Sequence, residues 1–123
     1  MSKYHSTKIE YDGMVFDSKK ELRRFKELSL LEKAGEIQDL KRQVKFEVLP
    51  AQREPEYITA NGRVRLGNVL ERKVVYIADF VYIKDGETVV EDVKGYKSGV
   101  AYNLFVIKRK LMLYRHNIRV LEV

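Results

Sequence analysis

The chain of 123 residues contains no cysteine, which excludes disulfide bonds, thiolate nucleophiles and cysteine-based zinc sites. Histidine is also scarce, because only His5 and His116 are present. Two histidines without cysteine are too few ligands for a structural zinc centre.

Long apolar runs are absent as well. No uninterrupted apolar stretch approaches the roughly 20 residues that a membrane-spanning helix requires. Residues 1–5 lack the apolar segment of a signal peptide. We therefore expect a soluble, cytoplasmic protein with no membrane partner.

The composition fits one folded domain. Hydrophobic residues make up 45% of the chain and charged residues 34%, which is enough for a core and excludes a wholly disordered chain. The chain is too short for a second core and contains no linker or internal repeat. We expect a single domain over residues 1–123, with a flexible segment at residues 1–7.

The net charge of +6 is unevenly distributed. Residues 94–123 contain seven Lys and Arg residues against Glu122 alone, whereas the rest of the chain is balanced. A basic end of this kind is typical of proteins that bind nucleic acid, although a solvated basic face on an ordinary enzyme has the same composition.

The spacing of apolar residues, turn residues and helix caps predicts an α/β sandwich. After an N-terminal hairpin the predicted order is helix, three strands, helix, strand, with a central mixed sheet flanked by the helices. The predicted elements are a hairpin over 8–16, a helix over 19–33, extended segments over 37–40 and 44–49, strands over 74–83 and 88–94, a helix over 101–116 and a strand over 118–123. Residues 50–71 lack periodicity, so we expect a long loop or an irregular hairpin there.

The strand over residues 74–83 is apolar on both faces and should lie centrally in the sheet. Strict alternation predicts one face with Val75, Ile77, Val81 and Ile83, and another with Val74, Tyr76, Ala78, Phe80 and Tyr82. Asp79 is the lone carboxylate in this strand. Burying it without a partner would cost several kcal/mol, so something must compensate for its charge.

The Asp85-Gly86 turn sets the register of the hairpin that follows. Counted back from this turn, Asp79 lies directly opposite Asp92 on one face of the sheet. Directly opposed Cβ atoms are roughly 4.5 to 5.5 Å apart, so the two carboxylates repel each other unless they share a cation. Lys94 falls on the same face, and Glu91 points to the other side.

Two more charged residues fall where the helical pattern requires apolar ones. Glu21 lies within the apolar arc of the first helix, although it also fits a capping box that begins at Ser18. Together with Asp79 and Asp92 it would make an oxygen-rich site of the kind that magnesium or manganese prefers. Lys108 lies in the apolar face of the second helix, where a lysine that snorkels to solvent is the commoner explanation.

The pattern of Asp79, a short hairpin, Asp92-Val93-Lys94 and a preceding helix with Glu21 resembles the PD-(D/E)XK nuclease superfamily. More narrowly, residues 76–80, 91–95 and 107–110 are similar to a family of short phage and prophage proteins classed as endonucleases. Ala78 stands where the superfamily's name has proline. The resemblance covers residues 8–123 and implies a restriction-endonuclease-like core, with the order αβββαβ, that cleaves DNA.

The resemblance also implies a role for each residue. Asp79 and Asp92 would be ligands of Mg²⁺ or Mn²⁺, and Glu21 would bind the metal directly or through water. Lys94 would orient or help to deprotonate the attacking water, and Lys108 would contact the scissile phosphate or the catalytic lysine. The reaction would be metal-assisted phosphodiester hydrolysis in DNA recombination, repair or replication, in the cytoplasm of a bacterial host.

Contacts to DNA should come from basic residues after the catalytic strand and on the long loop, with an affinity that falls as salt rises. These residues are Lys97, Arg109, Lys110, Arg115, Arg119, Arg63 and Arg65. A homodimer would allow both strands of a duplex or junction to be cut. Two other functions stay open: a non-catalytic nucleic-acid-binding module with a vestigial nuclease site, and an RNA-associated structural protein.

Overall fold

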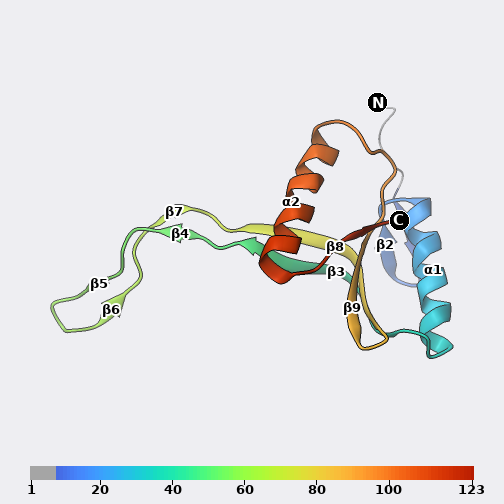
Figure 1. The fold of residues 1–123 in the computed structure, drawn as a ribbon, viewed down its shortest axis with the longest axis horizontal. Helices are drawn as coiled ribbons and strands as arrows, with labels where there is room; N and C mark the ends of the chain where they lie inside the picture. The colour runs from blue at the N-terminus through green and yellow to red at the C-terminus, as the bar shows by residue number, and fades with distance from the viewer. Residues whose placement is uncertain (1–7) are drawn as a thin grey trace.

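A four-stranded mixed sheet lies at the centre of the computed structural model, which describes residues 8–123 (Figure 1). The segment 1–7, with its predicted flexibility and with His5, lies outside the described residues. The sheet has the order β10-β9-β8-β3, in which only the β9–β10 pair is parallel. Its strands are β3 (Gln38–Leu49), β8 (Val74–Lys84), β9 (Glu87–Asp92) and β10 (Leu121–Glu122).

Two helices complete the predicted order of helix, three strands, helix, strand. They are α1 (Lys19–Lys33) and α2 (Val100–His116). Helix α1 begins where the sequence predicts it, because the Ser18 hydroxyl accepts a hydrogen bond of 3.1 Å from the backbone N–H of Glu21. The structure is therefore of the mixed α/β class, as predicted.

The N-terminal hairpin consists of β1 (Ile9–Tyr11) and β2 (Met14–Phe16) and lies against α1, where the rings of Phe16 and Phe25 are 5.2 Å apart. Three predicted strand extents are wrong. The segments predicted over 37–40 and 44–49 form one continuous strand, β3. The strand predicted over 88–94 ends at Asp92, and the strand predicted over 118–123 is confined to Leu121 and Glu122.

The two helices cover opposite faces of the sheet. Along β9, Val90 belongs to a buried cluster with Phe105 of α2, whereas Val89 packs against a second cluster that contains Leu28 of α1. Because successive side chains of a strand point to opposite faces, α1 and α2 lie on opposite sides of β9.

The alternation predicted for β8 breaks at Asp79. Tyr76 and Ala78 belong to the α2 cluster, but Phe80 and Tyr82, which alternation would place on the same face, belong to the α1 cluster. The prediction of one continuous face from residue 74 to residue 82 is therefore wrong. The strand changes faces in its middle, and Asp79 is the residue at the crossing.

Strand β3 changes faces at the same row. The Arg42 guanidinium lies 3.9 Å from the centre of the Phe16 ring on the α1 side, whereas Phe46 and Val48 belong to the α2 cluster. Between them, Gln43 has a φ of 52°, in the left-handed region. A single left-handed residue in an extended strand turns the following side chains to the other face, which accounts for the crossing.

Residues 50–73 form an irregular hairpin that extends away from the sheet as an arm (Figure 1). Of the two alternatives for this segment, the irregular hairpin is the one observed. Its short strands are β4 (Gln52–Arg53), β5 (Tyr57–Ile58), β6 (Val64–Arg65) and β7 (Val69–Glu71). Gly67 is required here, because a Cβ atom at this position would lie 2.0 Å from the carbonyl oxygen of Glu54.

Candidate active site

The hairpin formed by β8 and β9 has the predicted register. Pairing runs without interruption from Lys84 and Glu87 to Phe80 and Glu91. The next position in this register places Asp79 opposite Asp92. The two-residue turn at Asp85-Gly86 is formed with positive φ at both residues, which a tight hairpin turn needs.

A cleft of about 490 Å³ opens at this position. Four of the five predicted catalytic residues line it, namely Glu21, Asp79, Asp92 and Lys94. The other lining residues are Asp17, Ser18, Lys20, Gln43, Ile77, Val93 and Gly95. We call this cavity the carboxylate cleft.

The structure does not bring Lys108 into the carboxylate cleft. Lys108 is half-buried beside the stripe of α2 that packs into the core through Phe105 and Met112. Within residues 8–123, no hydrogen bond or ion pair involves its ammonium group. Its placement agrees with the snorkelling alternative.

Asp92 is buried, and both of its carboxylate oxygens have partners. The Tyr76 hydroxyl donates to Oδ2 over 2.6 Å, and the Lys94 ammonium lies 2.8 Å from Oδ1. Lys94 also lies 3.7 Å from the centre of the Phe105 ring, so it is held between a carboxylate and an aromatic face. Burial, with the hydrogen bond to Asp92, raises the pKa of Tyr76, so this tyrosine remains a donor.

Asp79 is held by the backbone N–H of Val93, which donates to Oδ2 over 2.8 Å. The Gln43 amide is 3.3 Å from Oδ1. Burial, and then the charges of Asp92 and Glu21, raise the pKa of Asp79 to about 6, despite these two hydrogen bonds. The negative charges in the cleft thus interact unfavourably, as the sequence predicts.

Glu21 bonds back to the chain one residue before Ser18, where the predicted capping box begins, and it also lines the cleft. It accepts a hydrogen bond of 3.3 Å from the backbone N–H of Asp17 just before the helix, and its other oxygen faces the cleft. That oxygen lies 3.3 Å from the Gln43 amide and 3.5 Å from the Arg42 guanidinium. Burial raises the pKa of Glu21 above its usual value.

Three of the carboxylates that line the cleft, those of Glu21, Asp79 and Asp92, have the oxygen-donor chemistry that a hard divalent cation prefers, and burial raises the pKa values of Glu21 and Asp79. In the described residues each of these carboxylates also bonds to donors of the chain itself. No group of three or more acidic or histidine side chains in residues 8–123 is already gathered as a metal site.

Glu91, the neighbour of Asp92, lies on the other face, as predicted. It is 1% exposed, and Arg24 of α1 binds both of its oxygens at 2.8 and 2.7 Å. The Tyr82 hydroxyl donates to the same carboxylate. Burial, with this hydrogen bond, raises the pKa of Tyr82 to about 12. This cluster is fully paired and offers no oxygen to a ligand.

The predicted DNA-binding residues do not form one cluster. Lys97, Arg109, Lys110 and Arg119 line a second cleft, of about 900 Å³, together with Glu122. Glu122 forms ion pairs with Lys97 at 3.3 Å and Arg109 at 2.8 Å. Hydrogen bonds from Tyr102, Lys97 and Arg109 lower the pKa of Glu122 although burial opposes them. Two of the four cations are thus partly neutralised.

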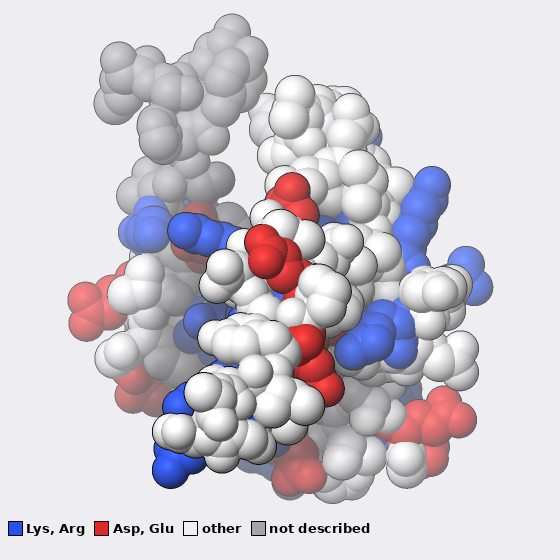
Figure 2. All heavy atoms as spheres, turned by 90° about the vertical axis from the view of Figure 1, so that its left-hand side faces the viewer, with Lys and Arg blue, Asp and Glu red and all other residues white. Residues whose placement is uncertain are grey.

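The other predicted contacts lie elsewhere. Arg115 does not line that cleft, and Arg63 and Arg65 are exposed on the arm. Viewed from the arm end, Lys and Arg side chains are spread around the molecule and interspersed with Asp and Glu (Figure 2). This face therefore shows no single basic patch.

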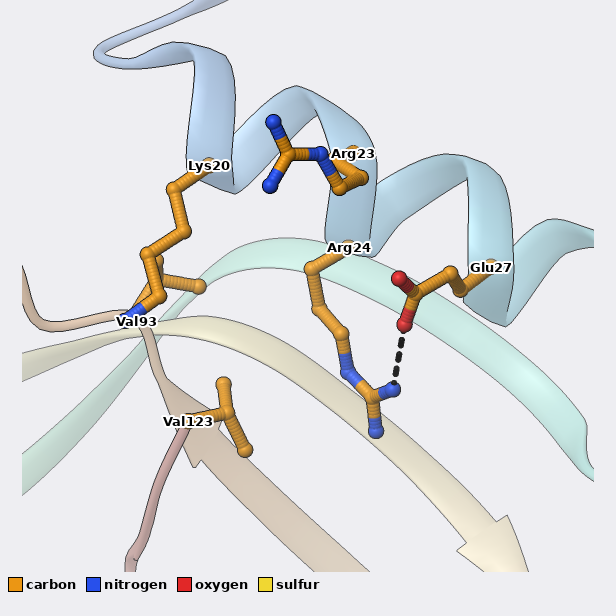
Figure 3. Close-up of a pocket in the computed structure, with 6 residues that line it drawn as sticks. All are labelled: Lys20, Arg23, Arg24, Glu27, Val93 and Val123. Carbon is orange, nitrogen blue, oxygen red and sulfur yellow. Dashed lines mark hydrogen bonds and ion pairs between the residues drawn. The ribbon is translucent and has the colours of Figure 1, made fainter.

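A smaller basic pocket, of about 280 Å³, borders the carboxylate cleft (Figure 3). Lys20, Arg23 and Arg24 of α1 line one side of it. Lys20 and Val93 line both cavities, and the Lys20 ammonium donates to the carbonyl oxygen of Lys94 over 2.6 Å. The sequence indicates no role for these three cations, because only the fold brings them to this pocket.

No helix within residues 8–123 is long and apolar enough to cross a membrane. The chain belongs to the family described as "Protein of unknown function (DUF1064)", whose model matches residues 1–121. It matches no curated protein and no solved structure.

Proposed function

We propose that this protein is a metal-dependent endonuclease that hydrolyses phosphodiester bonds in DNA. The carboxylate cleft carries the proposal, because it is lined by Glu21 of α1, Asp79 of β8, Asp92 at the end of β9, and Lys94 two residues after that strand. These are four of the residues, on the matching elements, that the PD-(D/E)XK resemblance assigns to the reaction.

The element order supports a restriction-endonuclease-like core. Apart from the N-terminal hairpin and the arm, the chain runs α1, β3, β8, β9, α2, β10, which is the αβββαβ order that the resemblance implies. The carboxylates come from α1, β8 and β9 in that scheme. Neither the hairpin strands nor the arm contributes a residue to the lining of the cleft.

Asp79 and Asp92 would hold Mg²⁺ or Mn²⁺, with Glu21 binding directly or through water. The bound cation would polarise the scissile phosphate and lower the pKa of the attacking water. Lys94 is fixed by Asp92 and the Phe105 ring at the edge of the cleft. From there its ammonium group can hydrogen-bond a phosphate oxygen or orient the water.

DNA contacts would come from two regions of the described surface. Lys20 and Arg23 lie beside the carboxylate cleft and would bind neighbouring phosphates. The arm is a two-stranded ribbon, a shape that the major groove of B-DNA admits, and its outer part carries Arg63 and Arg65. Binding through these cations would weaken as salt rises.

Cleavage assays on linear, forked and four-way DNA, on single-stranded DNA and on RNA, with Mg²⁺ or Mn²⁺, test the proposal. We expect Asp92→Ala and Lys94→Ala each to lower the rate of cutting by about 10²–10⁴-fold while DNA binding is retained. Glu87→Ala is the matched control, since Glu87 is an exposed carboxylate on the same strand outside the cleft.

Cutting by the wild type that needs the metal and the two cleft residues supports an endonuclease. If the wild type binds nucleic acid but cuts none of these substrates with either metal, the enzyme proposal is wrong and the chain is a binding module with a vestigial site.

The role of the arm has a separate test. Affinity for duplex DNA, measured across a salt series, should show a logarithmic slope that is smaller by about two when Arg63 and Arg65 are both replaced by alanine. Lys33→Ala, at the end of α1 on the other side of the molecule from the arm (Figure 1), should leave the slope unchanged. An unchanged slope in the arm variant contradicts this contact.

A further inference from the structure

Gln43 has a backbone conformation that a residue with a Cβ atom rarely adopts. Its φ is 52° in the middle of β3, where the register with β8 continues without a shift from Arg42 opposite Phe80 to Val44 opposite Ala78. No bulge accounts for this conformation. Left-handed residues other than glycine are strained and persist only where the surrounding structure holds them.

The strained residue lies in one row with two carboxylates of the cleft. Gln43 of β3 falls opposite Asp79 of β8, between the Arg42–Phe80 and Val44–Ala78 pairs. The β8–β9 register, continued one position beyond its last pair, places Asp79 opposite Asp92. This is also the row at which β3 and β8 change faces between the two core clusters. The left-handed turn therefore places Gln43 on the cleft, which it lines.

The Gln43 side chain connects the two carboxylates that come from different elements. Its amide nitrogen lies 3.3 Å from Glu21 Oε1 and 3.3 Å from Asp79 Oδ1. An amide nitrogen carries two hydrogens, so it can donate to both oxygens at once. It does so without adding a charge, and therefore does not compete with a bound cation as a lysine would.

We propose that Gln43 is a positioning residue of the carboxylate cleft, and that its strained backbone is retained because it fixes Glu21 and Asp79 in one orientation toward a divalent cation. The inference rests on the proposed function, which gives the cation its use in catalysis, but its test does not depend on DNA cleavage. Groups that orient metal ligands in this way commonly affect metal affinity by 10–100-fold.

The test compares Gln43→Ala with Gln43→Gly. Both variants remove the amide, but only glycine adopts a positive φ without strain. The glycine variant should therefore have a higher melting temperature than the alanine variant. In a calorimetric titration with MnCl₂ alone, both variants should bind Mn²⁺ at least about tenfold more weakly than the wild type.

Asp39 provides a matched control in the same strand. Its φ is 55°, and it is exposed at the register shift between Gln38 and Lys41, outside the cleft. Asp39→Gly should also melt at a higher temperature than Asp39→Ala, but neither change should alter Mn²⁺ affinity. A loss of affinity confined to Gln43 variants thus separates positioning from backbone strain.

Wild-type affinity for Mn²⁺ in Gln43→Gly overturns the inference, as does a wild-type protein that binds no Mn²⁺. If Gln43→Ala does not fold, the glycine variant gives the same answer. If the Mn²⁺ affinity of the wild type depends on Gln43 but the protein cuts no nucleic acid, the positioning role stands and the endonuclease proposal is wrong.

Discussion

Glu91 and Asp92 are consecutive residues of β9, yet their carboxylates lie in two clusters that differ in kind. Glu91 meets Arg24 and the Tyr82 hydroxyl on the α1 side, so its charge is compensated by a cation from another element. Asp92 lies at the carboxylate cleft with Asp79 and Glu21, where acids outnumber the bases that contact them. Burial of an acid therefore does not by itself indicate a candidate site, whereas a cleft lined by more acids than the bases that contact them does.

The largest expected effect on stability comes from breaking the buried ion pair between Glu91 and Arg24. Glu91→Ala should lower the free energy of unfolding by about 3 kcal/mol, because the partly buried Arg24 guanidinium loses its buried partner and keeps only the exposed Glu27, at 2.9 Å. This value is at the lower end of the range for buried pairs, since the Arg24 side chain is 27% exposed. Urea denaturation measures it. A loss under about 0.5 kcal/mol would show that the Glu91 cluster is not a stabilising pair, and so would remove its contrast with the carboxylate cleft.

Removal of a charge from the carboxylate cleft should raise the stability of the protein rather than lower it. Asp79 has its pKa raised to about 6, so its contribution to stability is complete below the pKa of the unfolded chain and is lost as pH rises through about 6. Asp79→Asn should therefore be more stable than the metal-free wild type at pH 7, by on the order of 2 kcal/mol. The difference should vanish near pH 4.

Urea denaturation at several pH values in the presence of a chelator measures this difference. Glu122 titrates in the opposite direction, because its pKa is lowered, but it is common to both proteins and cancels in the comparison. A variant that is less stable than the wild type at pH 7 would show that the cleft carboxylates are compensated after all.

A matched pair of tyrosines gives the smallest effects. The Tyr82 hydroxyl bonds to Glu91, and the Tyr76 hydroxyl bonds to Asp92. Each change to phenylalanine should cost about 1 kcal/mol of stability. Only Tyr76→Phe should also lower the rate of metal-dependent cleavage, because it frees Asp92 in the cleft. Equal cleavage rates for both variants would contradict the assignment of Tyr76 to the site.

Local signals predicted much of the fold. Ser18 caps α1 at the predicted residue, and the Asp85-Gly86 turn fixes the predicted register of β8 and β9. Both depend on residues close together in the chain, where capping and turn geometry decide the structure. Glu21 was predictable for the same reason, because its helical position fixes the side on which it lies.

The roles that could not be predicted from the sequence depend on contacts between segments that are distant in the chain. Arg24 reaches Glu91 across 67 positions, and Gln43 reaches Asp79 across 36. The change of faces at Gln43 breaks the period of two on which strand prediction relies, so Phe80 and Ala78 could not be assigned to different cores. The polar stretch at residues 41–43, which separates two apolar segments, was the one sequence signal of this change of faces.

Cleavage of DNA by Asp92→Asn and Glu91→Gln, measured with Mg²⁺ on samples whose folded fraction is known, distinguishes the two carboxylates. We expect folded Asp92→Asn to cut at least about 10²-fold more slowly than the wild type. Glu91→Gln should cut at the wild-type rate per folded molecule, despite its lower stability. Wild-type cleavage by Asp92→Asn would contradict the assignment of the carboxylate cleft as the active site.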